Sequence, residues 1–578
     1  MQEIQSNIGV GCNDAKANAN MPQITGGQAL VAQLLKQEVE SLFLIPGVQL
    51  DWAVDALREQ QSRISVYVPR HEQATTYMAD GYARISGTPG VAMVVPGPGV
   101  LNACSGMATA YASNSPVVLI AAQVHSGGIG KGFGLLHEIK DQSRLLGSVT
   151  KWNGLARNVE DIPKLVARGF AAAMECRRRP VAVEIAHNLL EAKAEIRARR
   201  PRAPGAAPPA DERAIDAAAE LLDSARLPVI YAGGGVMPGD ACEQLYRLAR
   251  RLNIPVVMSD NARGALPDQD PLAFTTLAGR VVFEKADVVL VAGSRFMDSL
   301  AVQPSWPVDG KRYIHINIDA ADLSAPRQPC VSIVGQAGAV LGLLAQKVKQ
   351  RRVCTAEALA AAKQWAQQEV DKIGPQCAYI RAMRRALPEN GIFVNELTQV
   401  GYLARVAWPV SIPRTYIGPG YQGTLGYGYP TAIGAAIAAQ GRPVLAITGD
   451  GGLGWNMQEL ATASKYEVNV ILVVFNDGYF GNVRALQRRQ FGAEIGVDLR
   501  NPDFARLAQA FDMAFERAQS PQALGEAVAR GVARGGPTLI EAPVGEMPSP
   551  WPLLRLQPMA GSGNASRMDP NPFVERED

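Results

Sequence analysis

The sequence predicts an α/β fold of three doubly wound domains, each built on a parallel sheet. Nearly continuous runs of Val, Ile and Leu alternate with amphipathic stretches, and such runs are typical of strands buried on both faces of a parallel sheet. The helix-like segments between them indicate βαβ units. The clearest predicted strands lie at 91–95, 117–122, 228–232, 288–292, 444–448 and 470–475.

Two stretches of unusual composition divide the chain of 578 residues. Residues 191–212 are rich in Ala, Arg and Pro, and residues 346–364 are polar and rich in Ala, so we expect both to be linkers. Each segment between them has the size of one doubly wound domain. The predicted domains are 23–190, 210–345 and 365–550, with tails at 1–22 and 556–578.

The composition excludes several classes of protein. Lys and Arg number 57 and Asp and Glu 54, and a net charge of +3 is too small for an electrostatic nucleic-acid surface. No apolar stretch reaches the roughly 18–20 residues of a spanning helix, and the polar N-terminus has no signal-peptide pattern. The seven cysteines form no CxxC pair, which is typical of reduced thiols. We therefore expect a cytoplasmic protein that binds neither nucleic acid nor membrane.

Two acidic residues follow predicted strands of the third domain. Gly449-Asp450-Gly451-Gly452 comes directly after one strand, with a helix expected to start near Asn456, and Asn476-Asp477-Gly478 follows the next strand. The separation of Asp450 and Asp477, 477 − 450 = 27 residues, fits one βαβ unit. Because the carboxyl ends of parallel strands meet at one edge of a sheet, we expect the two carboxylates to converge.

The chemistry of these two segments points to a bound phosphate and a cation. Glycines let the backbone approach a phosphate, and a following helix N-terminus favours an anion. Two carboxylates beside a phosphate favour a hard cation, Mg²⁺ or Ca²⁺. Each segment alone also fits a simple turn. Their combination at neighbouring strand ends favours the ligand site.

This pattern resembles the thiamine diphosphate binding motif, Gly-Asp-Gly followed one βαβ unit later by Asn or Asp. The whole chain is similar to thiamine-diphosphate-dependent enzymes of the acetolactate synthase, pyruvate oxidase and benzaldehyde lyase group, closest to the acetolactate-synthase-like proteins. The resemblance implies that Asp450, Asp477 and the backbone carbonyl of Tyr479 hold Mg²⁺, with Asn476 as the alternative to Asp477. The family pattern also places the cofactor against Gly449, Gly451, Gly452, Tyr479, Phe480 and Gly481.

Two further segments of the third domain resemble cofactor loops of the family. The backbone carbonyl that matches Gly423 binds the 4′-amino group of the cofactor, and Leu425 stands where an apolar side chain holds the cofactor bent. By themselves these glycine-rich residues also fit a merely flexible loop. The segment after a predicted strand at 391–394 would be the first diphosphate loop, made of Asn395, Glu396, Leu397 and Thr398.

The first domain would supply proton chemistry through Glu72, which precedes a predicted helix at 74–85. Taken alone, Glu72 fits an ordinary first-turn residue stabilised by the helix dipole. In the family, the matching Glu binds N1′ of the aminopyrimidine and so helps to deprotonate C2 of the cofactor. The resemblance therefore makes Glu72 catalytic. It also places the cofactor beside Pro46, Gly47 and Pro96.

Four residues are expected to face the substrate. His137 lies near the position of a Gln in acetolactate synthases and is a candidate acid or base, with a surface His as the alternative reading. Leu486 replaces a Trp that shapes the choice of acceptor in true acetolactate synthases. Val48 and Gln49 complete this predicted substrate pocket.

The central domain resembles the domain that binds FAD in some members of the family. Tyr231-Ala-Gly233-Gly234-Gly235 is an incomplete GxGxxG pattern. The Gly-Met-His-Gly stretch associated with FAD is replaced by Thr275-Thr-Leu-Ala-Gly279. This replacement favours a protein without FAD.

The resemblance names the three domains pyrimidine-binding, central and diphosphate-binding, and implies a lyase or transferase that needs thiamine diphosphate and Mg²⁺. The leading expectation is decarboxylation of a 2-oxo acid and ligation of the remaining fragment to a second carbonyl. The alternatives are a non-oxidative decarboxylase, a lyase or hydrolase of ketones and diketones, a FAD-linked oxidase, and a cofactor-binding protein without turnover. Because the domains of Glu72 and Asp450 would meet across subunits, the resemblance also implies a homodimer as the smallest active unit, paired into a homotetramer.

Overall fold

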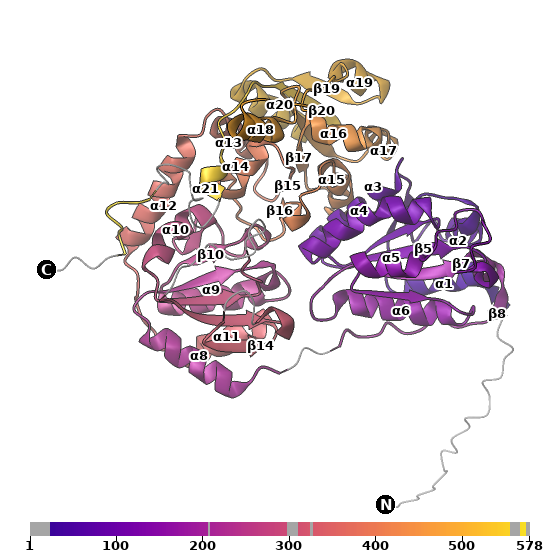
Figure 1. Ribbon diagram of the computed structural model, residues 1–578, viewed down its shortest axis with the longest axis horizontal. Helices are drawn as coiled ribbons and strands as arrows, with labels where there is room; N and C mark the ends of the chain where they lie inside the picture. Colours follow the sequence, from indigo (N-terminus) through magenta and orange to yellow (C-terminus); the bar gives the residue numbers. More distant parts are fainter. Residues whose placement is uncertain (1–22, 206–208, 298–309, 324–327, 555–566, 574–578) are drawn as a thin grey trace, which may run out of the picture.

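The computed structural model describes residues 23–205, 209–297, 310–323, 328–554 and 567–573. Three lobes follow one another along the chain, and each contains a six-stranded sheet (Figure 1). Every strand pair within these three sheets is parallel, so the predicted fold class is confirmed. The expected tail at 1–22 and most of that at 556–578 lie outside the described residues.

The first domain has strand order β3-β2-β4-β5-β7-β6, and a separate antiparallel pair joins β1 to β8. Its strands are β1 Gln23–Thr25, β2 Ser41–Leu44, β3 Ser65–Tyr67, β4 Gly90–Val94, β5 Val117–Gln123, β6 Trp152–Leu155, β7 Val181–Ala186 and β8 Lys193–Glu195. Its α-helices are α1 Gly26–Lys36, α2 Asp51–Arg58, α3 Glu72–Ser86, α4 Pro98–Ser113, α5 Gln142–Val149, α6 Asp161–Met174 and α7 His187–Glu191.

The central domain has strand order β11-β10-β9-β12-β13-β14. In order of appearance along the chain this is 3-2-1-4-5-6, the arrangement of dinucleotide-binding folds. Its strands are β9 Pro228–Ala232, β10 Val256–Met258, β11 Ala273–Phe274, β12 Val288–Ala292, β13 Arg312–Asn317 and β14 Val331–Val334. Its α-helices are α8 Glu212–Ser224, α9 Ala241–Leu252, α10 Thr276–Lys285 and α11 Ala337–Lys347.

The third domain has strand order β16-β15-β17-β18-β20-β19. Its strands are β15 Ile392–Asn395, β16 Tyr416–Ile417, β17 Val444–Gly449, β18 Val470–Asn476, β19 Ala514–Arg517 and β20 Thr538–Pro543. Its α-helices are α12 Ala356–Asp371, α13 Gln376–Ala386, α14 Gln399–Ala407, α15 Gly428–Ala438, α16 Asp450–Asn456, α17 Leu460–Lys465, α18 Gly481–Phe491, α19 Phe504–Ala510, α20 Pro521–Arg534 and α21 Trp551–Leu554.

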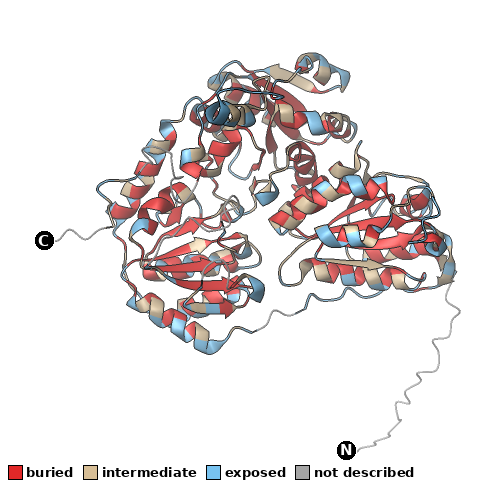
Figure 2. Cartoon of the chain, viewed as in Figure 1, coloured by how far each residue is buried: buried red, intermediate tan, exposed pale blue. Residues whose placement is uncertain are grey.

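The central strands are buried on both faces, and the outward faces of the helices carry the exposed residues (Figure 2). One apolar cluster is shared by the first and third domains, where α3 packs against α15 on one side and against α4 on the other. A second cluster covers the other face of the first sheet with α1, α2 and α6. A third cluster joins the central domain to the far face of the third. The first and third domains therefore share one helical layer.

Some local expectations differ from the structure. The helix expected near Asn456 begins at Asp450, because α16 follows directly after β17. The glycines at 451, 452 and 454 lower the intrinsic helix propensity of this segment, but tertiary packing overrides that propensity. The predicted linker at 346–364 contains the first half of α12, which also crosses residue 365, and β8 lies beyond residue 190. The domain boundaries themselves stay predictions.

Within the described residues, no helix combines the length and the apolar character that a bilayer-crossing segment needs.

Candidate active site

The predicted cofactor residues of the third domain lie where its sheet reverses strand order. In the order β16-β15-β17, the connections of β15 and β17 leave toward opposite sides, which opens a crevice at the carboxyl ends of these two strands. Residues 396–398 follow β15, and Asp450 follows β17. Asp477 follows β18, the next strand of the sheet. The fold therefore brings these three predicted loops to one edge.

The two acidic residues lie close enough to influence one another. Asp450 is buried, and burial raises the pKa of its carboxyl. Burial also raises the pKa of Asp477, to about 6, and the negative charge of Asp450 adds to the rise. Two carboxylates held together in a partly dry site repel each other unless a cation or a proton neutralises them. The pair therefore fits a hard divalent cation.

Backbone and side-chain donors fix the orientation of both carboxylates. Gly478 N donates to Asp450 Oδ2 at 3.0 Å, and Tyr479 N donates to Asp477 Oδ1 at 3.0 Å. Asn501 Nδ2 donates to Asp450 Oδ2 at 2.6 Å and to Asn476 Oδ1 at 2.9 Å. The sequence analysis did not identify Asn501. It lies 51 positions after Asp450, and no motif or spacing in the sequence connects the two residues.

The alternative metal ligand, Asn476, is turned into the protein. Its Nδ2 donates to Glu541 Oε1 at 2.9 Å, and its Oδ1 accepts from Asn501. The Asp477 carboxylate instead lies in the same neighbourhood as Asp450. This arrangement favours Asp477 over Asn476 as the ligand.

The glycines after Asp450 are required by close packing. A Cβ at Gly452 would lie 2.4 Å from Glu396 Oε1, and one at Gly451 would lie 2.7 Å from Phe480 Cε1. A Cβ at Gly481 would lie 2.5 Å from Asp477 Oδ2. An open cavity of about 420 Å³ lies beside Asp450 and is lined in part by Trp455, Phe480 and Asn501. The loops are thus packed tightly against one another and leave room for a ligand on one side.

Glu396 acts as a clamp between the loops. Glu396 is 1% exposed, and its carboxylate accepts hydrogen bonds from Gly426 N at 2.5 Å and Gly428 N at 3.0 Å. Burial raises its pKa to about 7. The Glu396 side chain therefore holds the 423–428 segment against the Gly449–Gly452 turn.

The other residues of the predicted diphosphate loop and the bending residue have distinct surroundings. Asn395 Nδ2 donates to Gly401 O and to Tyr416 Oη, and Thr398 Oγ1 caps α14 by accepting from Gly401 N. A Cβ at Gly423, which has φ +60°, would lie 3.6 Å from Leu397 Cδ1. Leu425 is half-buried in the same segment. These residues surround the crevice at the end of β15.

Glu72 is the first residue of α3, two residues earlier than the predicted helix start. Its carboxylate is half-buried, and Asn102 Nδ2 on α4 donates to its Oε2 at 2.9 Å. The sequence analysis did not identify Asn102. The signal that could have found it is its position four residues after Pro98, near the start of a helix. Within the described part of the chain, no hydrogen bond or ion pair joins Glu72 to Asp450 or Asp477.

The structure brings Gln49 and His137 together. Gln49 Nε2 donates to Leu136 O at 3.3 Å, and its Oε1 lies 3.2 Å from His137 Nδ1. Because the amide oxygen can only accept, His137 Nδ1 carries the hydrogen, and Nε2 is the ring nitrogen that takes no part in this contact. Pro46, Gly47 and Val48 precede Gln49 directly after β2. His137 itself adopts φ +67°, a conformation uncommon outside glycine.

Pro96 and Leu486 differ in their surroundings. Pro96 is buried directly after β4 and precedes Gly97, where a Cβ would lie 2.3 Å from His137 O. Leu486 is exposed on α18, which has no buried residue. Pro96 therefore lies by the Gln49–His137 pair, whereas Leu486 is open to solvent like Val48.

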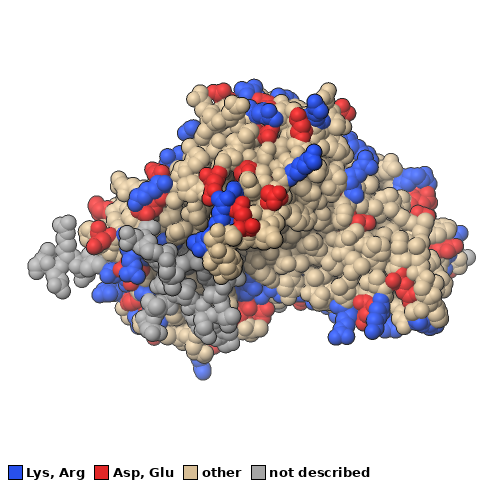
Figure 3. Space-filling model, turned by 45° about the horizontal axis from the view of Figure 1, so that its top comes forward, with Lys and Arg blue, Asp and Glu red and all other residues tan. Residues whose placement is uncertain are grey.

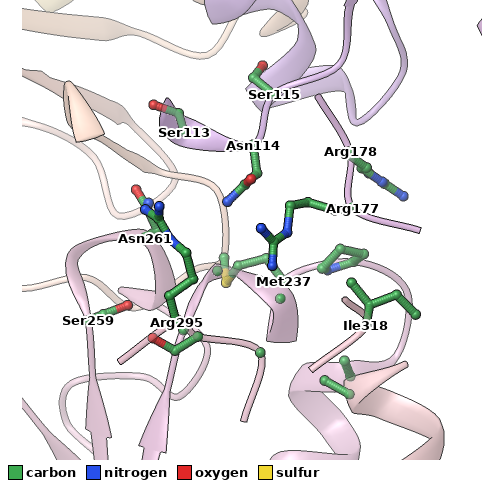
Figure 4. Close-up of a pocket in the computed structure, with 18 of the residues that line it drawn as sticks. Ser113, Asn114, Ser115, Arg177, Arg178, Met237, Ser259, Asn261, Arg295 and Ile318 are labelled. Atoms are coloured by element: carbon green, nitrogen blue, oxygen red, sulfur yellow. The ribbon is translucent and has the colours of Figure 1, made fainter. Parts of the chain in front are cut away.

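A larger cavity of about 750 Å³ lies where the first and central domains face each other, and third-domain residues also line it (Figure 4). Ser113–Ser115, Arg177 and Arg178 come from the first domain, and Gly233–Gly235 and Arg295 follow β9 and β12. The replaced segment Thr275–Gly279 caps and begins α10, and its Thr276 lines the cavity. Arginines make this cavity suitable for an anionic group.

Among the described residues, no three His, Cys, Asp or Glu side chains are grouped so that they alone could hold a metal ion. A cation at Asp450 and Asp477 would therefore complete its coordination with backbone oxygens and with oxygens of a ligand such as a diphosphate, as Mg²⁺ commonly does.

Comparison with known protein families covers all three domains. Residues 24–145 match the family described as thiamine pyrophosphate enzyme, N-terminal TPP binding domain. Residues 215–344 match its central domain, and residues 398–542 match its C-terminal TPP binding domain.

Similar proteins are found among bacteria and archaea. A probable 2-ketoarginine decarboxylase from Pseudomonas aeruginosa is 35% identical over 529 residues, 90% of this chain and 94% of that protein. A probable acetolactate synthase large subunit from Methanocaldococcus jannaschii is 31% identical and covers 89% of this chain and 91% of its own. The large subunit of acetolactate synthase isozyme 3 from Escherichia coli is 31% identical, over 85% of this chain and 89% of its own.

Proposed function

Since the chain belongs to the thiamine pyrophosphate enzyme family and is a decarboxylase or carboligase that uses this cofactor, we propose that it decarboxylates a 2-oxo acid and releases the aldehyde. The proposal that an aldehyde is released rests on the contact between His137 and Gln49, which holds a protonatable ring nitrogen at the strand-end edge of the first domain. When bound, thiamine diphosphate supplies the electron sink that lets the carboxyl group leave as CO₂.

Asp450, Asp477 and the backbone of Tyr479 would hold Mg²⁺ and, through it, the diphosphate. The fit rests on the mutual repulsion of the two carboxylates, on donors that already orient them, and on glycines that keep side chains out of the crevice. All of these donors to the metal are oxygens, which Mg²⁺ prefers.

Glu72 would hold the proton shared with the aminopyrimidine ring. Asn102 occupies its Oε2 by donation, so Oε1 is the oxygen available for that proton. His137 would then move a proton from Nε2 to the carbon that has lost CO₂, because Nδ1 is bound to Gln49 Oε1 and cannot take part. Gln49 keeps the ring in one tautomer throughout.

Carboligation is the second candidate. Two of the similar proteins described above are an acetolactate synthase large subunit and a probable one. Val48 and Leu486 are exposed apolar side chains that would accommodate an acceptor carbonyl compound. The first step, decarboxylation of a 2-oxo acid, is the same. The two candidates differ only in whether a proton or a second carbonyl reaches the same carbon.

The proposed enzyme needs no flavin, because the FAD-associated stretch is replaced by Thr275–Gly279. The 750 Å³ cavity has room for a large anionic ligand, so the absorption spectrum of the purified protein is the test. A protein without flavin absorption that is fully active with thiamine diphosphate and Mg²⁺ supports this proposal. Bound flavin would contradict it.

The proposed active unit is a homodimer, assembled into a tetramer. Exposed large apolar side chains are numerous at the strand-end loops of the first domain and on and after α18, namely Val48, Phe133, Leu136, Val483, Leu486, Phe491 and Ile495. On the face in Figure 3, acidic and basic side chains are intermingled, and a broad area carries few of them. A second copy of the chain would cover such surfaces. Free cysteines support a reducing, cytoplasmic setting.

A substrate panel tests the proposed reaction. The purified protein with thiamine diphosphate and Mg²⁺ is given pyruvate, 2-oxobutyrate, benzoylformate, a cyclic diketone and 2-ketoarginine, the last chosen from the name of the Pseudomonas relative. CO₂, aldehydes and acyloins are followed by mass spectrometry. CO₂ with aldehyde supports the decarboxylase, CO₂ with acyloin supports the second candidate, and turnover of a diketone without CO₂ would contradict both.

A further inference from the structure

A carboxylate is buried behind the strand-end loops of the first domain. Glu184 lies on β7, in the interior of the sheet, and is 0% exposed. Its Oε1 accepts from Ser143 Oγ at 2.6 Å, and its Oε2 accepts from Gln142 Nε2 at 3.1 Å and Gln123 Nε2 at 3.2 Å. A buried charge is tolerated only with such partners. We call Gln123, Gln142, Ser143 and Glu184 the buried polar network.

The network fixes the orientation of the Gln142 amide. Gln142 Nε2 donates both to Glu184 Oε2 and to Ala122 O, at 3.0 Å for the latter. An ionised carboxylate and a carbonyl can only accept, so the NH₂ group must face them. The amide oxygen of Gln142 therefore faces the other way, where it accepts from Gly97 N at 3.0 Å. Glu184 thus determines which atom Gln142 offers to Gly97.

Gly97 transmits this constraint to His137. Gly97 has φ +60° and follows Pro96 in the loop after β4. Its Cα approaches the His137 backbone so closely that a Cβ would lie 2.3 Å from His137 O. A shift of the Gly97 backbone would therefore displace the His137 backbone, and with it the ring that contacts Gln49.

We propose that Glu184 and Gln142 are positioning residues that set the place of the Pro96–Gly97 turn and, through it, of the His137 ring. The proposal rests on the proposed function for its effect on catalysis, because there His137 delivers the proton. Its geometric part, that the network holds His137, stands independently of that role.

The test variant is Gln142→Met, which keeps the length of the side chain and removes both the acceptor of Gly97 N and a donor to Glu184. The matched control is Gln33→Met. Gln33 is equally buried in the same domain, and its amide also makes two hydrogen bonds to backbone, both to Arg199 on the far side of the sheet. Each variant loses two hydrogen bonds to backbone, and Gln142→Met also loses one to Glu184, so the denaturation midpoint of each variant is measured beside its reactivity.

The readout is the reaction of His137 with diethyl pyrocarbonate, followed by peptide mass spectrometry, with exposed His125 as the internal reference. We expect the ratio of the His137 rate to the His125 rate to change several-fold in Gln142→Met and to stay unchanged in Gln33→Met. We also expect kcat to fall about 10- to 100-fold with KM nearly constant in Gln142→Met only, since misplacement of an acid costs turnover.

A swapped pair provides the rescue. Gln142→Glu alone sets two carboxylates against each other, whereas Gln142→Glu with Glu184→Gln restores the donor–acceptor pair between the two positions. Both variants keep an acceptor for Gly97 N and lose the donor to Ala122 O. The double variant should recover at least tenfold in kcat over Gln142→Glu. If Gln142→Met does not fold, Glu184→Gln takes its place in the modification experiment.

The outcomes separate the two proposals. Unchanged His137 reactivity in a folded Gln142→Met protein overturns the positioning role, whatever its activity. Altered reactivity with an unchanged product and kcat supports the positioning role and instead removes the catalytic role of His137 from the proposed function.

Discussion

The first and third domains have the same strand order and different chemistry. Numbered within each domain, both sheets read 2-1-3-4-6-5, β3-β2-β4-β5-β7-β6 in the first and β16-β15-β17-β18-β20-β19 in the third. The central domain reads 3-2-1-4-5-6 and differs from both. A strand order shared by two domains brings equivalent loops to equivalent edges. What the domains do there depends on the side chains that each loop carries.

The equivalent loops can be compared one by one. The loop after the second strand carries Glu72 in the first domain and Gly423 and Leu425 in the third. The loop after the fourth strand carries His137 in the first domain and Asp477 in the third. In the first domain these positions suit proton transfer, and in the third they suit a cation and a diphosphate. Under the proposed function, one scaffold therefore serves binding or catalysis according to a few loop residues.

The two domains also pack through equivalent helices, α3 and α15, in a reciprocal way. A Cβ at Gly81 of α3 would lie 2.0 Å from Thr431 O, and a Cβ at Gly434 of α15 would lie 1.9 Å from Met78 O. The contacts are thus symmetric: each glycine packs against a backbone carbonyl on the other helix, three residues before the glycine of that helix. Such closeness demands glycine on both helices.

The largest effect should come from Glu72→Gln, which removes the proton site of the first domain and leaves the third domain intact. We expect kcat to fall about a thousandfold, within the range typical of acid–base residues. The affinity for thiamine diphosphate, measured by calorimetry, should stay near the wild-type value. Full activity of this variant would contradict the assignment of proton transfer to the first domain and of cofactor binding to the third.

Asp450→Ala should give the converse result in the third domain. Loss of one carboxylate should weaken Mg²⁺-dependent binding of thiamine diphosphate about 100-fold, or about 2.7 kcal/mol. Titration calorimetry with and without Mg²⁺ measures this change. Equal affinity of the variant and the wild type would show that the cation is held elsewhere.

Gly81→Ala and Gly434→Ala should each lower the free energy of unfolding by about 1–3 kcal/mol, because a methyl group would overlap a backbone carbonyl. If the reciprocal packing is correct, the two losses should be similar. Gly147→Ala on α5 and Gly454→Ala on α16 are controls, since their Cβ atoms would meet nothing closer than 3.6 Å. Denaturant unfolding measures all four, and unequal losses at Gly81 and Gly434 would contradict the symmetry.

The smallest effect should be a pH dependence specific to the third domain. The pKa of Asp477 is raised to about 6 in the fold, whereas that of an ordinary Asp is about 4. The contribution of Asp477 to the free energy of unfolding is therefore full below about pH 4 and is lost as the pH rises through 6. The cofactor-free protein should therefore gain a few degrees in Tm between pH 8 and pH 5. Mg²⁺ with thiamine diphosphate should stabilise it most above pH 6, since protons displace the cation below.

Asp477→Asn is the control for this pH dependence. Without a titrating carboxyl at this position, the gain in Tm on acidification should shrink, and the remainder would come from groups such as Glu396, whose pKa is raised to about 7. An unchanged profile in the variant would show that Asp477 does not titrate in this range.

The sequence by itself determined the fold class and most of the predicted loops. Buried strands such as 444–448 and 470–475 show themselves as apolar runs, and the ends of parallel strands must meet at one edge. The family resemblance added Glu72 and the roles of Asp450 and Asp477. These signals are local in sequence, so they could be used before the structure was known, and the roles of these three residues stay predictions.

Only the tertiary structure decided the partners of these residues. Asn501 reaches Asp450 from 51 positions later in the chain, and Glu396 clamps Gly426 and Gly428 instead of facing the crevice. The start of α16 at Asp450 depends on packing of its glycines against other loops, which outweighs helix propensity. Contacts between distant segments leave no periodic trace in the sequence, because they depend on how the loops fold onto one another.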